Sequence, residues 1–302
     1  MNINQADLNL LKVFEALHDE GSASRAALQL GLTQSAVSAA LNRLRTMYGD
    51  QLFVRTGRGL SPTLIANQLK PVISDALNKC RHSFSLVQPT LASYEGRSVT
   101  IGLSDDFEIA LGRKLIETVA QRAKNLRLIF RQTHSQIAVD ALMERQFDLI
   151  ITAGGVPNRL LGRQLLGEGG YACLVDRGSL DDSAALDLED YVAREHILIS
   201  SGGFIGIVDE GLAARGLSRR VATATTHFAA LPFLLKGSSA VATLPTHAAR
   251  AIARLCDIRM VPCPIELPHY PIELGWRTHA QTDGAVLLVK QAIIDSFALS
   301  TG

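Results

Sequence analysis

The chain has 302 residues, a hydrophobic fraction of 47%, a charged fraction of 20% and a formal net charge of +1. This composition is ample for a core and fits one large domain or two to three modest ones. No apolar run approaches the roughly 20 residues that cross a bilayer, and residues 1–11 are too polar for a secretion signal. We therefore expect a cytoplasmic protein with no membrane partner, and not an exported solute-binding protein.

Residues 22–63 predict a helix, a tight turn, a second helix and a basic hairpin. In the first helix Ala26 and Ala27 allow close packing, and Gly31 fits the turn because it has no Cβ. Thr33 is a good N-cap for the second helix. This order of elements is typical of a winged helix-turn-helix, which reads the major groove of DNA.

The second helix is expected to have two faces of different chemistry. Apolar side chains at helical spacing predict a buried face, made of Ala36, Val37, Ala40, Leu41 and Leu44. The opposite face, which includes Arg45, carries side chains that bond base edges and phosphates. Together with the cap and the hairpin arginines, it gives the candidate DNA-binding residues Thr33, Gln34, Ser35, Ser38, Asn42, Arg43, Arg55 and Arg58.

The charge of this segment supports a nucleic-acid partner. Residues 21–70 contain six basic residues and one acid, Asp50, whereas the whole chain is nearly neutral. A local basic excess indicates a polyanion site confined to one domain. The alternative is a small-residue helical pair with a solvated charged face.

The segment also carries a pattern of particular residues: Leu10, Phe14, Gly21-Ser22, Ala26-Ala27, Leu30, Gln34-Ser35-Ala36-Val37-Ser38, Leu44, Leu52-Phe53, Arg55 and Thr63. This pattern resembles the N-terminal domain of LysR-type transcriptional regulators, although many members carry Glu where this chain has Arg45. The resemblance implies a homo-oligomer, usually a tetramer built as a dimer of dimers, that binds double-stranded promoter DNA. It further implies a C-terminal domain that binds a small effector, and it allows a contact with RNA polymerase.

Residues 63–92 predict one long helix that Pro71 should kink. Apolar side chains recur in it at steps of three and four, close to a heptad: Ile65, Leu69, Val72, Ala76, Cys80, Phe84, Val87 and Leu91. A long amphipathic helix directly after a DNA-binding domain at residues 1–62 is most simply a linker that dimerises. The alternative is a helix that packs on its own domain.

Residues 97–302 alternate between strands and helices and predict a parallel sheet covered on both faces. Strands are expected at 99–103, 126–131, 148–152, 171–175, 196–199, 220–224, 240–244, 258–262 and 272–276, with extended chain at 164–170. Helices are expected at 107–123, 136–145, 205–215, 228–236, 246–254 and 283–299. The elements form two α/β lobes, the first at 97–168 with 269–302 and the second at 169–268.

The chain is therefore expected to be α/β overall. Its parts are an N-terminal all-α winged helix-turn-helix, a long linker helix and a C-terminal two-lobed α/β effector domain. The resemblance to the LysR-type family implies that this last domain is similar to periplasmic binding proteins.

Ligands of open parallel sheets meet the carboxyl ends of strands and the N-termini of helices. Those positions give the candidate effector-binding residues Ser104, Asp105, Phe107, Arg131, Thr152, Gly154, Ser201, Gly202, Phe204, His227 and Thr243. The set fits a small, partly apolar organic acid. Three of these predictions have alternatives without a ligand. Asp105 could be the N-cap of the next helix, residues 200–204 could form a plain glycine turn, and His227 could be a surface residue. Residues 226–228 with Pro232 are similar to LysR-type members that sense aromatic acids or flavonoids.

The sequence offers little support for other functions. It contains no nucleophile elbow, P-loop, dinucleotide or zinc-protease motif, so we expect no enzyme, no cofactor and no metal. Cys256 and Cys263 are close enough in sequence to form a redox pair, the alternative being reduced cysteines in a cytosolic core. A redox-responsive regulator and a solute-binding module without a regulatory role remain the rival hypotheses.

Overall fold

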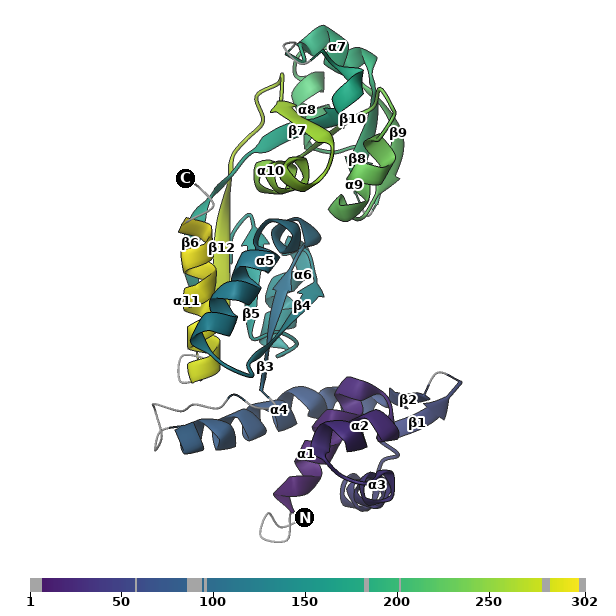
Figure 1. Ribbon diagram of the computed structural model, residues 1–302, viewed down its shortest axis with the longest axis vertical. Coiled ribbons are helices and arrows are strands. Elements are labelled where there is room, and N and C mark those ends of the chain that lie inside the picture. Colours follow the sequence, from purple (N-terminus) through teal and green to yellow (C-terminus); the bar gives the residue numbers. More distant parts are fainter. Residues whose placement is uncertain are drawn as a thin grey trace. The chain divides into compact units, whose positions relative to one another are not determined.

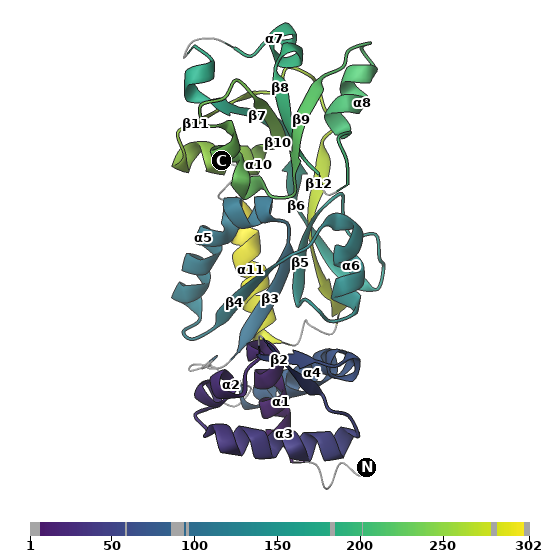
Figure 2. The same ribbon diagram turned by 90° about the vertical axis from the view of Figure 1, so that its right-hand side faces the viewer.

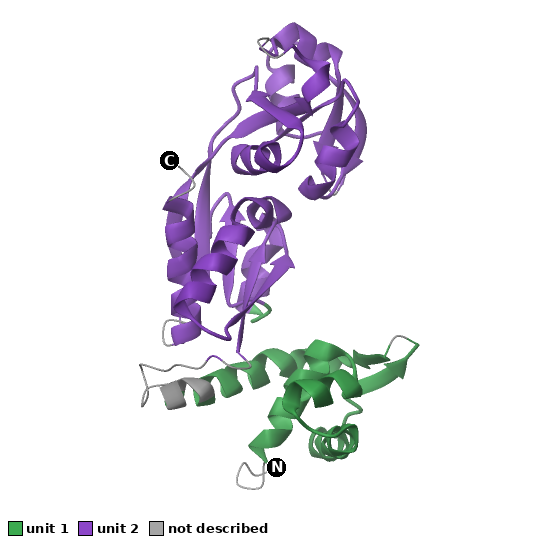
Figure 3. Ribbon diagram, viewed as in Figure 1, with its two compact units in different colours: residues 1–92, 144–146 green, residues 93–143, 147–302 purple. Residues whose placement is uncertain are grey.

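The computed structural model describes residues 7–57, 59–85, 94, 97–181, 185–200, 202–278 and 283–298. The chain forms two compact units (Figure 3). Unit 1 contains residues 1–92 with 144–146, and unit 2 contains residues 93–143 and 147–302. Each unit has its own core.

The described residues of unit 1 form four helices and a two-stranded antiparallel wing. Its elements are α1 (Leu8–Glu20), α2 (Ala23–Leu30), α3 (Gln34–Tyr48), β1 (Phe53–Thr56), β2 (Gly59–Pro62) and α4 (Leu64–Ser85). Gly31 makes the turn between α2 and α3 with a φ of 65°, a conformation that a side chain disfavours. The Thr33 hydroxyl then accepts the Ala36 amide at 3.2 Å and begins α3.

The core of unit 1 is one apolar cluster to which α1, α2, α3, α4 and the wing contribute. Phe14, Leu44 and Phe53 are fully buried within it. On α3 the buried residues are Val37, Leu41 and Leu44, whereas Ala36 is exposed. The prediction that Ala36 faces the core was wrong, because it lies one residue before Val37, about 100° away around the helix.

Helix α4 has two apolar faces with different surroundings. Ala66, Ile73 and Leu77 are buried in the core of unit 1, and Pro71 lies inside the helix without ending it. On the expected stripe, Ile65 is 40% exposed and Val72 is 58% exposed. Leu69 of the stripe packs against the same core. The helix therefore packs on its own unit through one face and leaves Ile65 and Val72 uncovered in this unit. The structure does not describe the side chains of the stripe residues Phe84, Val87 and Leu91.

The first sheet of unit 2 has the strand order β4-β3-β5-β12-β6 (Figure 1). Its strands are β3 (Ser98–Leu103), β4 (Arg127–Gln132), β5 (Leu149–Ala153), β6 (Leu161–Gly169) and β12 (Tyr270–Arg277). The first three pair in parallel as the sequence predicts, whereas β12 pairs antiparallel with β5 and β6. Helices α5 (Asp105–Arg122) and α11 (Gly284–Ala298) pack on one face, and α6 (Ser135–Met143) packs on the other.

The second sheet has the order β11-β7-β10-β8-β9. Its strands are β7 (Tyr171–Asp176), β8 (Glu195–Ile199), β9 (Arg220–Thr225), β10 (Val241–Pro245) and β11 (Ile258–Pro262). Helices α9 (Leu231–Leu235) and α10 (Thr246–Leu255) cover one face, and α7 (Leu188–Ala193) and α8 (Ile207–Ala213) cover the other. Figure 2 shows the chain passing between the sheets in β6–β7 and in β11–β12.

The sequence did not predict α7, or the antiparallel pairing of β7 with both β10 and β11. Helix α7 has only six residues, too few for a periodic pattern, and its start depends on the Asp187 carboxylate accepting the Asp190 amide at 2.8 Å. The direction of β7 is set by the crossing between the sheets, which periodicity does not reveal.

A buried polar network joins α7, α8 and the second sheet. The ring of His196 is fully buried, with Nε2 2.8 Å from the Tyr191 carbonyl and Nδ1 3.2 Å from the Arg219 guanidinium. Arg219 in turn donates two hydrogen bonds to Asp209, at 2.9 and 2.8 Å. Burial lowers the pKa of His196 from 6.5 to about 4, because the charged ring would be taken out of water.

This burial predicts acid sensitivity. The folded-state pKa of His196 lies below the unfolded-state value, so the unfolded chain binds more protons and stability is lost as the pH falls from about 6.5 toward 4. Between pH 7.5 and pH 5.0 the free energy of unfolding should drop by about 2 kcal/mol through this residue. Urea unfolding of unit 2, followed at both pH values, should show a smaller drop in the free energy of unfolding for His196→Asn than for the wild-type protein. An equal drop in both proteins would contradict the assignment.

Candidate nucleic-acid interface and effector site

Helix α3 presents a continuous polar surface in unit 1. Of the predicted DNA-binding residues, Thr33, Gln34, Ser35, Ser38, Asn42 and Arg43 are all exposed, and Figure 2 shows α3 along one outer side of the unit. The opposite side of the helix is anchored by buried Val37, Leu41 and Leu44. A helix held in this way places its polar face outward, as base-edge contacts in a major groove require.

Arg45 does not belong to the free polar face. Its guanidinium donates hydrogen bonds to the backbone carbonyls of Gln51 and Phe53, at 2.9 and 2.8 Å, and lies 3.3 Å from the Asn42 side-chain oxygen. Arg45 therefore fixes the start of the wing relative to α3. Asp50 supports the same junction by accepting the Leu52 amide and the Thr63 hydroxyl, at 2.6 and 2.7 Å.

The excess of basic over acidic residues in unit 1 is smaller than the count over residues 21–70 implied. Arg25 lies 3.4 Å from the Glu20 carboxylate, Lys70 lies 2.6 Å from that of Asp19, and Arg43 lies 3.3 Å from that of Asp7. These acids lie outside residues 21–70 and so escaped the count. Arg55 on β1 is exposed and has no ion pair among the described residues, which suits a phosphate contact. Arg58 lies outside the described residues.

In unit 2, three residues with hydroxyl side chains lie at the ends of neighbouring parallel strands. Ser104 follows β3, Thr133 follows the neighbouring β4, and Thr152 lies near the end of β5 on the other side of β3. Thr152 is 2% exposed and donates to the Gly155 carbonyl at 3.3 Å. Thr133 is 5% exposed, and its hydroxyl has no hydrogen-bond partner within the described part of the chain.

Sequence reasoning missed Thr133. The strand was expected to end at Arg131, whereas β4 continues to Gln132, so the residue directly after the strand is Thr133. The rule that selected Ser104 and Thr152 would have selected Thr133 with the correct boundary.

Residues 227–229, which follow β9 of the second sheet, contact residues at the same edge. The Gln132 amide lies 3.4 Å from His227 Nδ1, and the Ala229 amide donates to the Asp105 carboxylate at 3.3 Å. His227 and Asp105, which the sequence singled out from different lobes, are therefore both placed near the ends of β3 and β4.

The remaining predicted effector residues have other surroundings. Phe107 is 1% exposed and stacks on His247, with ring centroids 4.6 Å apart. Arg131 lies over the Phe147 ring at 5.7 Å, toward the α6 side. The Thr243 hydroxyl is 2.7 Å from the Tyr191 hydroxyl on the α7 side of the second sheet. Gly154 has a φ of 91°, Gly202 and Phe204 are exposed, and Ser201 lies outside the described residues.

The cysteines group differently from the sequence expectation. Cys263 packs in the same cluster as buried Cys173, whereas Cys256 packs on the opposite face of the second sheet. The neighbouring Cys173 thiol lowers the pKa of Cys263, and the Arg219 guanidinium adds to this effect. All four cysteines are free.

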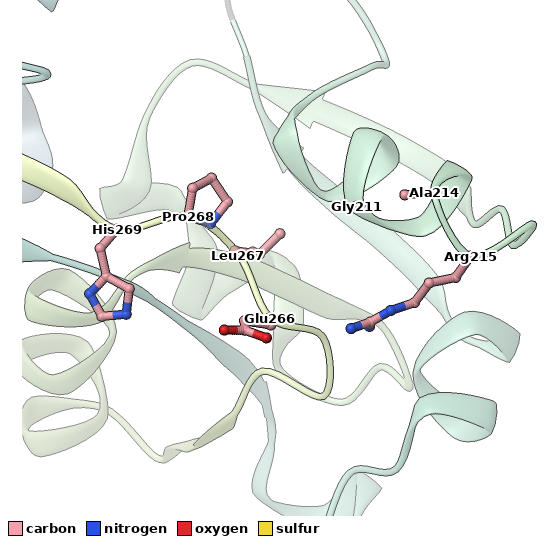
Figure 4. A pocket seen from close by; sticks show the side chains of 7 residues that line it. All are labelled: Gly211, Ala214, Arg215, Glu266, Leu267, Pro268 and His269. Atoms are coloured by element: carbon pink, nitrogen blue, oxygen red, sulfur yellow. The ribbon is translucent and has the colours of Figure 1, made fainter.

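Two hollows open on unit 2. One, of about 460 Å³, is an open surface groove between α8 and residues 266–269, with Arg215 and Glu266 on its walls (Figure 4). The other, of about 200 Å³, lies between α5, α10 and α11. Within the described ranges no cluster of His, Cys, Asp and Glu is arranged to hold a metal ion, and no helix is long and apolar enough to span a membrane.

Comparison with known proteins identifies the family to which the two units belong. Residues 8–66 match the lysR family of bacterial regulatory helix-turn-helix proteins, and residues 92–298 match the LysR substrate binding domain. The chain belongs to the LysR family of transcriptional regulators. It is a DNA-binding regulator, with unit 1 as the helix-turn-helix part and unit 2 as the part through which a small effector acts.

Two relatives and one solved structure illustrate the similarity. The transcriptional activator NahR of Pseudomonas putida is 31% identical over 98% of this chain and 99% of its own length. Nodulation protein D 2 of Rhizobium tropici is 26% identical over 99% and 95%. The crystal structure of a probable transcriptional regulator of Pseudomonas aeruginosa superposes with a TM-score of 0.74 and 27% identity, over 96% of this chain and 98% of that one.

The two kinds of DNA contact should separate in a mutational test. Gln34→Ala should weaken binding to a specific promoter site by about 1–3 kcal/mol, because the amide is predicted to contact a base edge. Binding to random DNA should change little. Arg55→Ala should weaken both DNAs alike and flatten the dependence of affinity on salt, because a phosphate contact releases counterions. Fluorescence anisotropy at several salt concentrations measures both effects. Equal losses for both variants on both DNAs would contradict this division.

Proposed function

We propose that the effector of this LysR-family regulator is a small, partly apolar organic acid that binds where β3, β4 and β5 end. The observation that carries the proposal is the buried Thr133 hydroxyl, which has no partner within the described residues. A buried hydroxyl without a partner is costly, and a ligand oxygen in this place would satisfy it. Ser104 and Thr152 lie on adjacent strands and supply further hydroxyls.

The charges around this edge constrain how the acid lies. The first turn of α5 contains Asp105, Asp106 and Glu108, which repel a carboxylate. We therefore place the ligand's acidic group toward Thr133 and His227, and its apolar part along the edge. The similarity of residues 226–228 to regulators that sense aromatic acids or flavonoids supports an aromatic acid.

We further propose that the chain acts in the cytoplasm as a dimer of dimers and has no catalytic activity of its own. The partly exposed stripe of Ile65 and Val72 on α4 supports a dimer contact, since the opposite face of α4 is already buried. Binding of two half-sites by one oligomer would raise affinity through effective concentration.

The dimer contact can be tested on α4. Val72→Asp should place an unpaired charge in the contact and give smaller species in light scattering, with loss of affinity for two-site DNA. Val72→Thr, which keeps the shape and adds no charge, should remain oligomeric. A full oligomer for Val72→Asp would show that the stripe does not carry the contact.

The effector site can be tested once a thermal-shift screen of monocyclic aromatic carboxylates has given a ligand. Thr133→Val should weaken binding of that ligand by about 0.5–1.5 kcal/mol, about 2- to 12-fold in affinity, because one hydrogen bond is lost. Thr100→Val serves as the control, since Thr100 lies in the first half of β3, away from the ends of these strands. Calorimetry should also show that DNA binding without ligand is unchanged. Unchanged ligand affinity in Thr133→Val and Ser104→Ala would place the site elsewhere.

A further inference from the structure

Two of the four cysteines are neighbours in the second lobe of unit 2, although they are far apart in sequence. Cys173 lies in β7 and pairs with Val261 of β11, and Cys263 directly follows β11. Because side chains alternate along a strand, position 263 shares a side of the sheet with position 261, and therefore with Cys173. Both cysteines belong to the apolar cluster that α7 and α8 cover. The pairing of β7 with β11 thus brings the two thiols together.

The two thiols differ in their access to solvent. Cys173 is fully buried, whereas Cys263 is partly exposed. A small reagent from solution therefore meets Cys263 first. The other two cysteines lie elsewhere, Cys256 on the opposite face of the second sheet and Cys80 on α4.

The surroundings of Cys263 favour its thiolate. The Cys173 thiol, the Ile265 amide and the Arg219 guanidinium lower the pKa of Cys263 to about 7, against the opposing effect of burial. The side chain of Arg219 is 1% exposed and donates two hydrogen bonds to Asp209, so its charge is held in place. At neutral pH a large fraction of Cys263 is therefore the nucleophilic thiolate.

The surroundings of Cys173 keep it protonated until Cys263 has reacted. Cys263 and burial both raise the pKa of Cys173. The Thr243 hydroxyl lies 3.4 Å from Cys173 Sγ and 2.7 Å from the Tyr191 hydroxyl, which fixes the buried thiol within the cluster. Once the Cys263 thiolate has been consumed, its negative charge no longer opposes ionisation of Cys173. The pair thus combines an accessible nucleophile with a buried thiol that can react second.

We propose that Cys263 is a site of oxidation by hydroperoxides and that Cys173 then forms a disulfide with it. In the first step the Cys263 thiolate attacks a peroxide oxygen, so that an S–O bond forms and the O–O bond breaks. With hydrogen peroxide, the leaving hydroxide takes up a proton and becomes water, and Cys263 is a sulfenic acid. In the second step the Cys173 sulfur attacks Cys263, the S–S bond forms and the S–O bond breaks. The leaving hydroxide accepts the Cys173 proton and becomes a second water. Peroxide is reduced by the two electrons that the sulfurs give up.

The disulfide would join the two segments through which the chain enters and leaves the second lobe. Cys173 lies in β7, which follows the crossing from β6, and Cys263 begins the segment that returns to β12 (Figure 2). Movement between lobes is absorbed by a few residues at the ends of such elements. Oxidation therefore acts beside the crossings on which the arrangement of the lobes depends. It requires no bound effector, so it stands or falls independently of the proposed effector site.

The disulfide is tested on the full chain with stoichiometric hydrogen peroxide. The variant Cys80→Ser/Cys256→Ser keeps only the proposed pair, and free thiols are blocked with N-ethylmaleimide before digestion. Mass spectrometry without reductant should show a peptide that links residues 173 and 263, in this variant and in the wild-type protein, and dithiothreitol should abolish it. In Cys173→Ala, dimedone should capture a sulfenic acid at Cys263. In Cys263→Ser, Cys173 should remain reduced. Thermal melts confirm that each variant is folded.

The thiolate step has a second readout, in a protein that keeps both cysteines. In reduced Cys80→Ser/Cys256→Ser, the rate of alkylation of Cys263 by iodoacetamide should rise less than about 1.5-fold between pH 8 and pH 9. A thiol with the ordinary pKa of about 8.5 gains about threefold over this range. A threefold gain at Cys263 overturns the proposal. So does a linkage of Cys263 to Cys256 in the wild-type protein, or a Cys263 that peroxide leaves fully open to N-ethylmaleimide.

Discussion

The arrangement of unit 2 depends on the buried carboxylate of Asp106. This residue is 4% exposed, and a charge so far from water requires hydrogen-bond partners. The Ser104 hydroxyl donates to one carboxylate oxygen, and His247 Nε2 lies 2.9 Å from the other. Ser104 belongs to the same lobe as Asp106, whereas His247 belongs to α10 of the second lobe. The second carboxylate oxygen of Asp106 therefore keeps this partner only while the two lobes are in contact. The ring of His247 also stacks on Phe107, nearly parallel at 7°.

This contact connects the proposed effector site with the arrangement of the lobes. Ser104 is a partner of Asp106 and also one of the hydroxyls proposed to meet the effector. An effector that draws the Ser104 hydroxyl away from Asp106 would change the surroundings of the α5–α10 contact. A ligand shifts the lobes only by its differential affinity for their two arrangements.

Local signals in the sequence predicted most of the elements and part of the sites. The N-cap Thr33, the turn at Gly31 and the periodicity of α3 identified the DNA-binding helix, because each acts within a few residues. The strand-end rule selected Ser104 and Thr152 from similarly local signals. It also selected Thr243, whose hydroxyl faces Tyr191, because a strand-end position in the sequence does not say which side of the sheet the side chain faces.

Long-range pairings could not be predicted in this way. Asp106 and His247 are 141 residues apart, and the neighbour of Cys263 is Cys173 and not the closer Cys256. Arg45 looks like a DNA-contacting residue in sequence, but the carbonyls of Gln51 and Phe53 occupy its guanidinium. Such partners are fixed by the strand topology and by the places where the chain crosses between the sheets. Sequence periodicity and spacing carry no information on either.

The central claim is that the Asp106–His247 contact holds the two lobes of unit 2 together. It is tested most directly by pulsed electron-spin distance measurements between labelled p-acetylphenylalanine residues at Ile137 on α6 and Phe233 on α9. Both positions are exposed, at 49% and 85%, so labels there leave the core intact. The account predicts one narrow distance distribution in the wild-type protein and a clearly broader or shifted one in His247→Ala. An unchanged narrow distribution in His247→Ala would contradict it.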